Sequence, residues 1–479
     1  MKNRTFGAAI GVAASLSILF GCKGPGAPWE VAALNWGGLP VQQAPHASAT
    51  LSLTLYGDQW ALVTDARSVR LAAGDQIIRF PGVPGQTDGR NAYLQVPARV
   101  DARRFRYDLK TRDKLLDQYH GSLVEIIPKE GTGSLQATLL MTDSGPVYKI
   151  GDTIYPEPPG KVALPPRADL ATDPTMEWIA SLASAWSGVA TASYVANQLG
   201  WQSEYTLVTD RLQTRGAWTH WAAITNRSDA AYRDARVTLV AGDVTRKEHF
   251  APMPLMAGGG RAYAEVSQGV VAEPYAARYQ YVLSEPLNLS RGAEERLRLA
   301  ERDQVTISRK FRVESHVAFY RITEPELPQK ARIRLTIKNT AASGLGMPIP
   351  RGKVAVYTPD AQDRLAIAGE PRIPDTPTEQ DLILDLGEAF DVTSKRVQTD
   401  YRTTDTTQET SYRITLRNEQ DAPVTVELIE QMSGDWTITS SSIPFEKLSS
   451  TQARFTPTIP AHGEVVVTYQ ASMKKERPT

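Results

Sequence analysis

The sequence has little of several things that define common protein classes. It contains one cysteine, Cys22, so no disulfide can form within the chain and its 479 residues must gain stability from burial of apolar side chains. Its 53 basic and 53 acidic residues balance, without the clustered basic excess typical of nucleic-acid-binding domains, so we expect no nucleic-acid partner. With 41% hydrophobic and 22% charged residues, the chain is neither disordered nor collagen-like nor a polytopic membrane protein.

Motifs for catalysis or cofactor binding are also lacking. Five residues, not four, separate Gly346 from Gly352, and Val354 stands where a P-loop needs a hydroxyl, so this stretch is interpreted as a turn before a strand. The six histidines are scattered, without HExxH spacing or cysteine partners, and no G-x-S-x-G elbow is present. We therefore expect no cofactor, no metal and no local catalytic motif, which makes an enzyme the less favoured class.

The N-terminus carries a targeting pattern. Lys2 and Arg4 precede an apolar stretch, residues 6–20, that is too short to span a bilayer. The sequence Leu19-Phe20-Gly21-Cys22 then resembles the lipobox of bacterial lipoproteins. That resemblance implies removal of a signal peptide, residues 1–21, and lipidation of the Cys22 thiol.

Lipidation would decide where the protein is located. Each acyl methylene buried in the membrane contributes about 0.8 kcal/mol, so two or three chains on Cys22 would hold the protein to a leaflet almost permanently. Lys23 is not the aspartate that keeps some lipoproteins on the inner membrane, and we expect the outer membrane of a bacterial cell envelope. Two alternatives stay open: a secreted protein cut near Ala27, and an uncleaved anchor.

Strand patterns dominate the rest of the chain. Leu51, Leu53 and Leu55 alternate with polar residues, and similar short runs separated by glycine turns continue to the C-terminus. The sequence predicts an all-β fold of several immunoglobulin-like β-sandwich or small-barrel modules, with one short helix at residues 111–119 capped by Thr111 or Asp108. The predicted segments are a tether at 22–48, an N-terminal β module with the short helix at 49–166, a central β-sandwich region at 170–390 and a C-terminal immunoglobulin-like sandwich at 391–475.

Two further patterns refine this prediction. Residues 294–303 have helix-forming composition, but Leu297 and Leu299 alternate with arginines, which favours a strand. Three alternating runs end in asparagine, at Asn226, Asn339 and Asn418, and each is followed by a polar turn and another strand. An asparagine side chain can bond the backbone of such a turn, so the repeated phrase indicates successive sandwiches.

Longer phrases are similar to a known family. PIPRGKVAVYTPD, LAIAGEPRIPDTP, DLILDLGEAFDV and SYRITLRNEQDAPVTVELIEQMSGDW resemble the bacterial family of domain of unknown function 4139, as does ASYVANQLGWQSEYTLV in the middle of the chain. TLYGDQWALVTDARSVRLAAGDQIIRFPGV resembles its companion N-terminal domain. The resemblance covers most of residues 50–475. It implies an all-β, envelope-associated protein and brings no established activity or catalytic residues.

Aromatic residues give the best binding signal. Five tryptophans lie in one short window, at positions 178, 186, 201, 218 and 221, and their flat rings suit sugars or peptides. Strand alternation places Trp218 with Ala222 and Ile224 on an inward face and turns Trp221 outward. Trp221 and Trp201 are therefore the candidate ligand-binding residues, unless a neighbouring domain covers Trp221.

One carboxylate stands out. In the predicted strand, Glu430 lies on the same apolar face as Val424, Val426 and Leu428. Burial should therefore raise its pKa unless Arg396, Arg413 or Arg417 pairs with it. A catalytic Glu430 would need a second carboxylate within reach in a cleft.

The leading hypothesis is a lipid-anchored envelope lipoprotein that acts as a non-enzymatic binding or scaffolding module. Its partners would be the membrane, through the lipid on Cys22, and an envelope protein or glycan. The alternatives are an envelope hydrolase with an unrecognised carboxylate site and an adhesin or secretion accessory.

Overall fold

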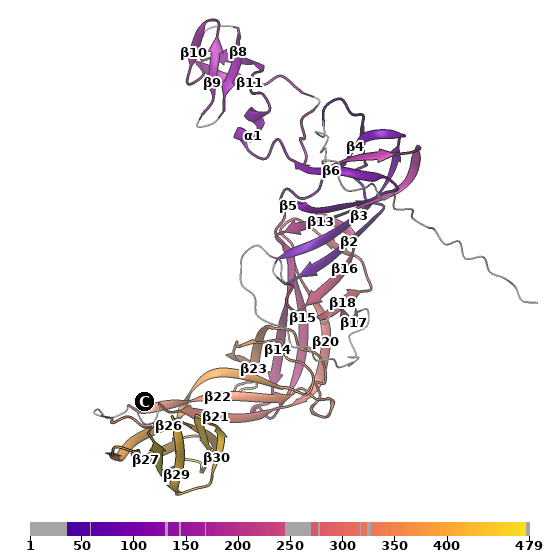
Figure 1. Ribbon diagram of the computed structural model, residues 1–479. Coiled ribbons are helices and arrows are strands. Elements are labelled where there is room, and N and C mark those ends of the chain that lie inside the picture. Colours follow the sequence, from indigo (N-terminus) through magenta and orange to yellow (C-terminus); the bar gives the residue numbers. More distant parts are fainter. Residues whose placement is uncertain are drawn as a thin grey trace, which may run out of the picture. The chain divides into compact units, whose positions relative to one another are not determined.

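The computed structural model describes residues 36–57, 59–129, 133–142, 145–167, 169–244, 270–275, 278–316, 318–322 and 327–475. These residues are almost entirely β-structure, which confirms the predicted all-β fold (Figure 1). The chain divides into two compact units, residues 1–39 and 40–479. The predicted signal peptide and Cys22 lie outside the described residues. Among those residues, no helix is long and apolar enough to cross a membrane.

Two sheets near the start of the second unit face each other across one apolar core. Leu53 and Leu55 of the eight-stranded sheet pack there with Phe80 and Trp178 of the four-stranded sheet. The four-stranded sheet runs in the order β1 (Val41–Gln43), β4 (Gly74–Pro81), β12 (Thr175–Leu182), β6 (Arg99–Arg106). The eight-stranded sheet runs in the order β17 (Val270–Tyr275), β18 (Arg278–Leu283), β16 (Tyr232–Ala241), β2 (Thr50–Tyr56), β3 (Trp60–Leu71), β13 (Trp186–Asn197), β5 (Thr87–Gln95), with β19 (Leu287–Leu289) also on β16.

A five-stranded sheet with the predicted short helix is inserted between β6 and β12. The helix α1 (Arg112–Asp117) begins at Thr111, whose hydroxyl accepts a hydrogen bond from the amide of Lys114, as the capping pattern predicts. Helix and sheet share a separate small core around Tyr119 and Tyr148. The sheet runs in the order β10 (Thr153–Tyr155), β9 (Val147–Ile150), β8 (Leu135–Met141), β7 (Leu123–Pro128), β11 (Gly160–Ala163).

The six-stranded sheet contains a strand with uninterrupted alternation of buried and less buried residues. Strand β15 (Arg215–Asn226) is buried at every second residue, which is the pattern of a strand with one face on a core. The segment 294–303 belongs to its neighbour β20 (Glu294–Thr306), so pairing overrides helix propensity there, as predicted. The sheet runs in the order β20, β15, β14 (Leu199–Thr209), β23 (Gly352–Pro359), β24 (Leu365–Gly369), with β25 (Arg372–Ile373) also on β23.

The ten-stranded sheet contributes to two cores. Leu382 and Leu384 of β26 (Asp381–Thr403) pack with Tyr205 and Trp218 of the six-stranded sheet, whereas Val392 of the same strand packs in the C-terminal core. The sheet runs in the order β29 (Asp435–Ser441), β33 (Gly463–Lys474), β27 (Thr407–Asn418), β26, β22 (Gln329–Lys338), β21 (Ser308–Glu314), β28 (Val424–Gln431), β31 (Gln452–Phe455), β30 (Phe445–Ser449), with β32 (Thr458–Ile459) also on β28. A short 3-10 helix, η1 (Ala341–Ser343), follows β22.

The three strand-ending asparagines are all fully buried and bond to backbone. Asn226 accepts from the amide of residue 228 and donates to the carbonyl of residue 230, and Asn418 makes the same two bonds to residues 420 and 422. Asn339 both donates to and accepts from the backbone of Met347. The asparagine side chains therefore replace missing backbone partners at the ends of these strands.

Strand pairing does not follow the predicted residue ranges. Strands β12 and β13, expected in the central region, pair with β4, β6 and β3 of the predicted N-terminal module. The boundary predicted between residues 390 and 391 lies inside β26. The predicted domain ranges stay a prediction about which segments fold independently.

Candidate functional site

The two tryptophans of β15 point to opposite faces of the six-stranded sheet. Trp218 is fully buried and tilts against Tyr205, whereas Trp221 is partly exposed. This is the arrangement that strand alternation indicates. The indole N–H of Trp221 donates to the hydroxyl of Thr206 on β14 at 3.2 Å, which holds the ring on the outer face of the sheet.

Trp221 belongs to a row of side chains that crosses this outer face. In the strand register Trp221 lies opposite Glu204 of β14, and Glu204 lies opposite Lys353 of β23. Lys353 in turn lies opposite Arg372 of β25. Paired residues on neighbouring strands share a face, so the row runs from an aromatic ring through a carboxylate to two cations.

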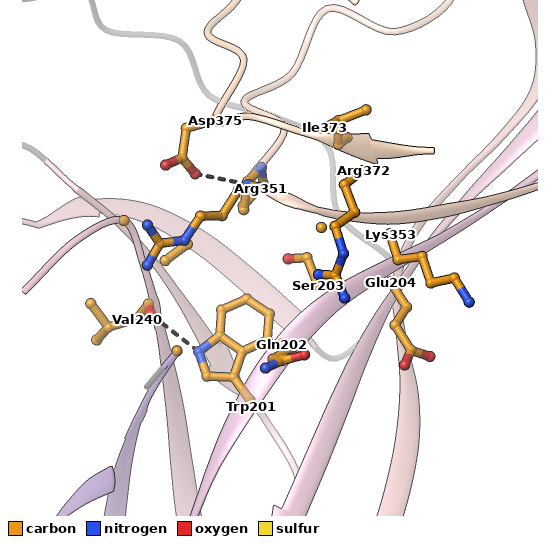
Figure 2. Close-up of a pocket in the computed structure, with 15 residues that line it drawn as sticks. Trp201, Gln202, Ser203, Glu204, Val240, Arg351, Lys353, Arg372, Ile373 and Asp375 are labelled. Carbon is orange, nitrogen blue, oxygen red and sulfur yellow. Dashed lines mark hydrogen bonds between the residues drawn. The ribbon is translucent and has the colours of Figure 1, made fainter. Parts of the chain in front are cut away.

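The cationic end of this row opens into a pocket of about 630 Å³ (Figure 2). Its walls come from the ends of β2 and β16, from β14, and from the start of β23 and of β25. Strand β14 pairs with β15 from Leu199 onward but with β23 only from Ser203, so β23 leaves the first residues of β14 uncovered. The pocket lies at this step, and its volume is in the range of small-molecule sites.

Hydrogen bonds fix the segment that leads into β23. The buried Tyr205 hydroxyl donates to the carbonyl of Pro350 at 2.6 Å, and the amide of Arg351 donates to the carboxylate of Asp375 at 2.8 Å. Gly352 is packed so closely that a Cβ atom there would lie 2.3 Å from the Ser203 carbonyl oxygen. Only glycine allows this approach, so the position of Arg351 and Lys353 on the pocket rim is set by backbone packing.

Trp201, the second aromatic candidate, forms part of the pocket wall but is itself buried. Its side chain is only 3% exposed. Its indole N–H donates to the carbonyl of Val240 at 3.1 Å, and its ring meets Tyr281 edge-on. Trp201 therefore shapes the pocket, and a ligand would reach only the small exposed part of the ring.

Three basic side chains from two segments of the chain, Arg351 and Lys353 at the start of β23 and Arg372 in β25, line the pocket. Figure 2 shows Arg351 and Arg372 above the ring of Trp201 and the amide of Gln202 in this view. The guanidinium of Arg351 lies 3.7 Å from Asp243, and the ammonium of Lys353 lies 2.9 Å from Glu370. These pairs are about half exposed, so each contributes little to stability.

A smaller cavity of about 290 Å³ lies on the other side of the same part of β14 and shares Trp201, Gln202 and Glu204 with the first. Here both arginines of the lining are paired with carboxylates, and Glu295 adds a further negative charge. Arg296 pairs with Glu204 at 2.9 Å, which raises the pKa of that arginine, and Arg227 pairs with Glu294 at 3.4 Å. The larger pocket is therefore the better candidate for a charged ligand.

Ser203 and His220 form a nucleophile–base pair in the wall between the pocket and the core. The Nε2 atom of His220 lies 3.0 Å from the Ser203 hydroxyl, but both residues are buried. Burial lowers the pKa of His220 to about 3, and its ring stacks on Tyr205. A histidine with so low a pKa is a weak general base at neutral pH, so the geometry favours a structural pair.

The buried carboxylate singled out from the sequence lies in the ten-stranded sheet. Glu430 has no exposed surface and pairs with Arg396 at 2.9 Å, one of the arginines proposed as a partner. The hydroxyl of Tyr469 donates to the same carboxylate oxygen at 2.5 Å. Desolvation raises the pKa of Glu430 despite the opposing attraction of Arg396. Glu430 and the tryptophan candidates therefore belong to different sheets and form no common site.

In the part of the chain that the structure describes, no three His, Cys, Asp or Glu side chains form a group that could hold a metal ion. No protein-family model matches the chain, and no curated protein is significantly similar to it. The resemblance to the family of domain of unknown function 4139 therefore stays a prediction.

Of the residues that line the pocket, sequence reasoning singled out only Trp201 as a binding candidate. Lys353 and Arg372 are brought to Glu204 by a parallel pairing of strands about 150 residues apart, which leaves no local signal. The burial of Trp201 could have been predicted from the alternation of its own strand, because Trp201 lies on the same buried face as Tyr205 and Leu207.

Proposed function

We propose that this protein is a lipid-anchored binding module of the bacterial cell envelope, without catalytic activity of its own, and that the pocket beside β14 receives its ligand. The observation that carries the proposal is this pocket of about 630 Å³, which the partly exposed Trp221 and the row of charged side chains adjoin. Small-molecule sites combine such concavity with a few fixed polar groups. The envelope location rests on the lipobox at Cys22, and the partner would be an envelope glycan or protein.

Binding is favoured over hydrolysis because of how the reactive side chains are placed. Glu430 has no exposed surface and is paired, so a substrate cannot reach it. The Ser203–His220 pair lies in a wall, with a base that is poorly matched to neutral pH. An envelope hydrolase would need other residues, and no specific feature favours an adhesin or a secretion accessory over a general binding module.

A pocket-filling variant tests the binding function. Gln202 is exposed in the pocket, so Gln202→Trp would place an indole in the ligand space. The full chain is purified from native membranes, and the small molecules released on denaturation are analysed by mass spectrometry. We expect a species that accompanies the wild type and is absent from Gln202→Trp.

The matched control is Gln95→Trp, the same change at an exposed position of β5. This control should retain the species. Identical released profiles for the wild type and Gln202→Trp, or no bound species in any sample, would contradict the proposal.

The anchor is tested separately, by the mass of the mature protein. Wild type should carry the added mass of the acyl chains, and Cys22→Ala should not. The same unlipidated mass for both proteins would show that the envelope anchor is wrong, while leaving the pocket untouched.

A further inference from the structure

Three cations from two segments of the chain line the pocket: Arg351 and Lys353 stand on either side of Gly352 at the start of β23, and Arg372 belongs to β25. Their local counter-charges are unevenly distributed. Lys353 pairs with Glu370 and Arg351 with Asp243, whereas the side chain of Arg372 makes no ion pair or hydrogen bond within the described residues. Arg372 therefore offers a guanidinium fork to the pocket.

The strand register brings two of these cations directly together. Lys353 and Arg372 are partners across β23 and β25, and like charges in directly opposite positions destabilise a pair of strands. Strand β25 has only two residues, so this pair forms half of its contact with β23. A bound anion would remove the repulsion, because both cations could share its oxygens.

The same wall limits how much negative charge a ligand can bring. Glu204 and Asp375 also line the pocket, and they would repel an extended polyanion. The exposed side chain of Gln202 offers an amide donor and an amide acceptor that suit hydroxyls. The combination fits a small hydroxyl-rich molecule that carries a single acidic group.

We propose that the pocket binds a sugar acid or a sugar phosphate, with the acidic group held between Lys353 and Arg372. This inference rests on the proposed binding function and adds the ligand class. A carboxylate and a phosphate are recognised by the same chemistry, since the planar guanidinium donates two parallel hydrogen bonds to either group.

Three probes on one hexose scaffold test the ligand class: glucuronic acid, glucose 6-phosphate and glucose. Binding to the full chain, freed of bound ligand, is measured by saturation-transfer NMR titration. One or both acidic probes should bind at least about tenfold more tightly than glucose, as expected for a hydrogen bond to a charged group. Raising the salt concentration should weaken that binding, because these side chains are partly exposed.

Arg372→Ala should weaken binding of the acidic probe about tenfold or more and leave glucose unchanged. Arg402→Ala, which removes an arginine that is 73% exposed on β26, is the matched control and should change nothing. Thermal unfolding of both variants checks that the fold is kept.

The outcomes separate the two proposals. Equal binding of glucose and the acids, or binding that Arg372→Ala does not alter, would overturn the anionic ligand class and leave the binding function standing. The same conclusion would follow if none of the three probes binds while the wild-type chain retains a ligand that the Gln202→Trp variant lacks. If no ligand is retained and no probe binds, both proposals fail.

Discussion

Glu177 in the four-stranded sheet and Glu430 in the ten-stranded sheet are equally buried but differently surrounded. Glu177 has bonds on both carboxylate oxygens, from Arg79 and Arg104 at 2.6 Å each, and Arg106 lies at 3.6 Å. Glu430 receives Arg396 and Tyr469 on one oxygen, and its other oxygen meets no donor of good geometry among the described residues.

The cations differ as well. Arg79 and Arg104 both bond to Glu177, and Arg106 lies between Glu177 and Asp108. Arg396, by contrast, also lies 3.6 Å from the centroid of the Tyr412 ring. A cation over an aromatic face retains part of its stabilisation when its ion-pair partner is lost. Burial alone therefore does not determine how much a carboxylate contributes to stability. The contribution also depends on how many cations bond to the carboxylate and on whether those cations have other partners.

The largest effect is expected for Glu177→Gln. The change removes the negative charge that Arg79 and Arg104 both contact and leaves Arg106 with Asp108, so the free energy of unfolding should fall by about 3–5 kcal/mol. Urea denaturation of the full chain measures it. A loss below about 1 kcal/mol would show that solvent and the remaining carboxylate, Asp108, compensate the arginines without Glu177.

Glu430→Gln, the matched change in the other sheet, should cost less. Glutamine can still accept the hydrogen bond of Tyr469, and Arg396 keeps the ring of Tyr412, so we expect a loss of about 1–2 kcal/mol. The same denaturation series gives the value. A loss as large as that of Glu177→Gln would erase the difference between the two clusters.

The smallest effect is the pH dependence at Glu430. Its pKa is raised in the folded state above the ordinary value of 4.5, so the folded chain holds a proton that the unfolded chain has released. The contribution of this proton to the free energy of unfolding is fully present below pH 4.5. It is lost as the pH rises through the folded pKa, by at most about 1.4 kcal/mol per pH unit. Comparing wild type with Glu430→Gln between pH 4 and 8 isolates this slope, and parallel curves would contradict the raised pKa.

Some of these features could be predicted from the sequence because they depend on local periodicity. Alternation alone separates the inward Trp218 from the outward Trp221, and it also indicates that Glu430 lies on a buried face. The capping hydroxyl of Thr111 and the strand-ending asparagines are likewise local, since each bonds backbone nearby in the chain.

Features that depend on long-range pairing could not be predicted. The opposition of Lys353 and Arg372 beside Glu204 requires the parallel register of β14 and β23, and no short stretch of sequence encodes that register. The arginines around Glu177 come from two strands, β4 and β6, that pair with β12 from distant parts of the chain, so they could not be predicted for the same reason. The proline-rich stretch before residue 170 does lie near a structural transition, but the strand that follows returns to the first sandwich.

The insertion of the five-stranded module has a practical consequence for protein engineering. The chain leaves the four-stranded sheet at Arg106 and re-enters it at Thr175, and these two residues face each other across β6 and β12. A tight hairpin turn could therefore replace everything between them without stretching either strand. A fluorescent protein or an affinity domain whose N- and C-termini lie close together could therefore replace the five-stranded module at this position.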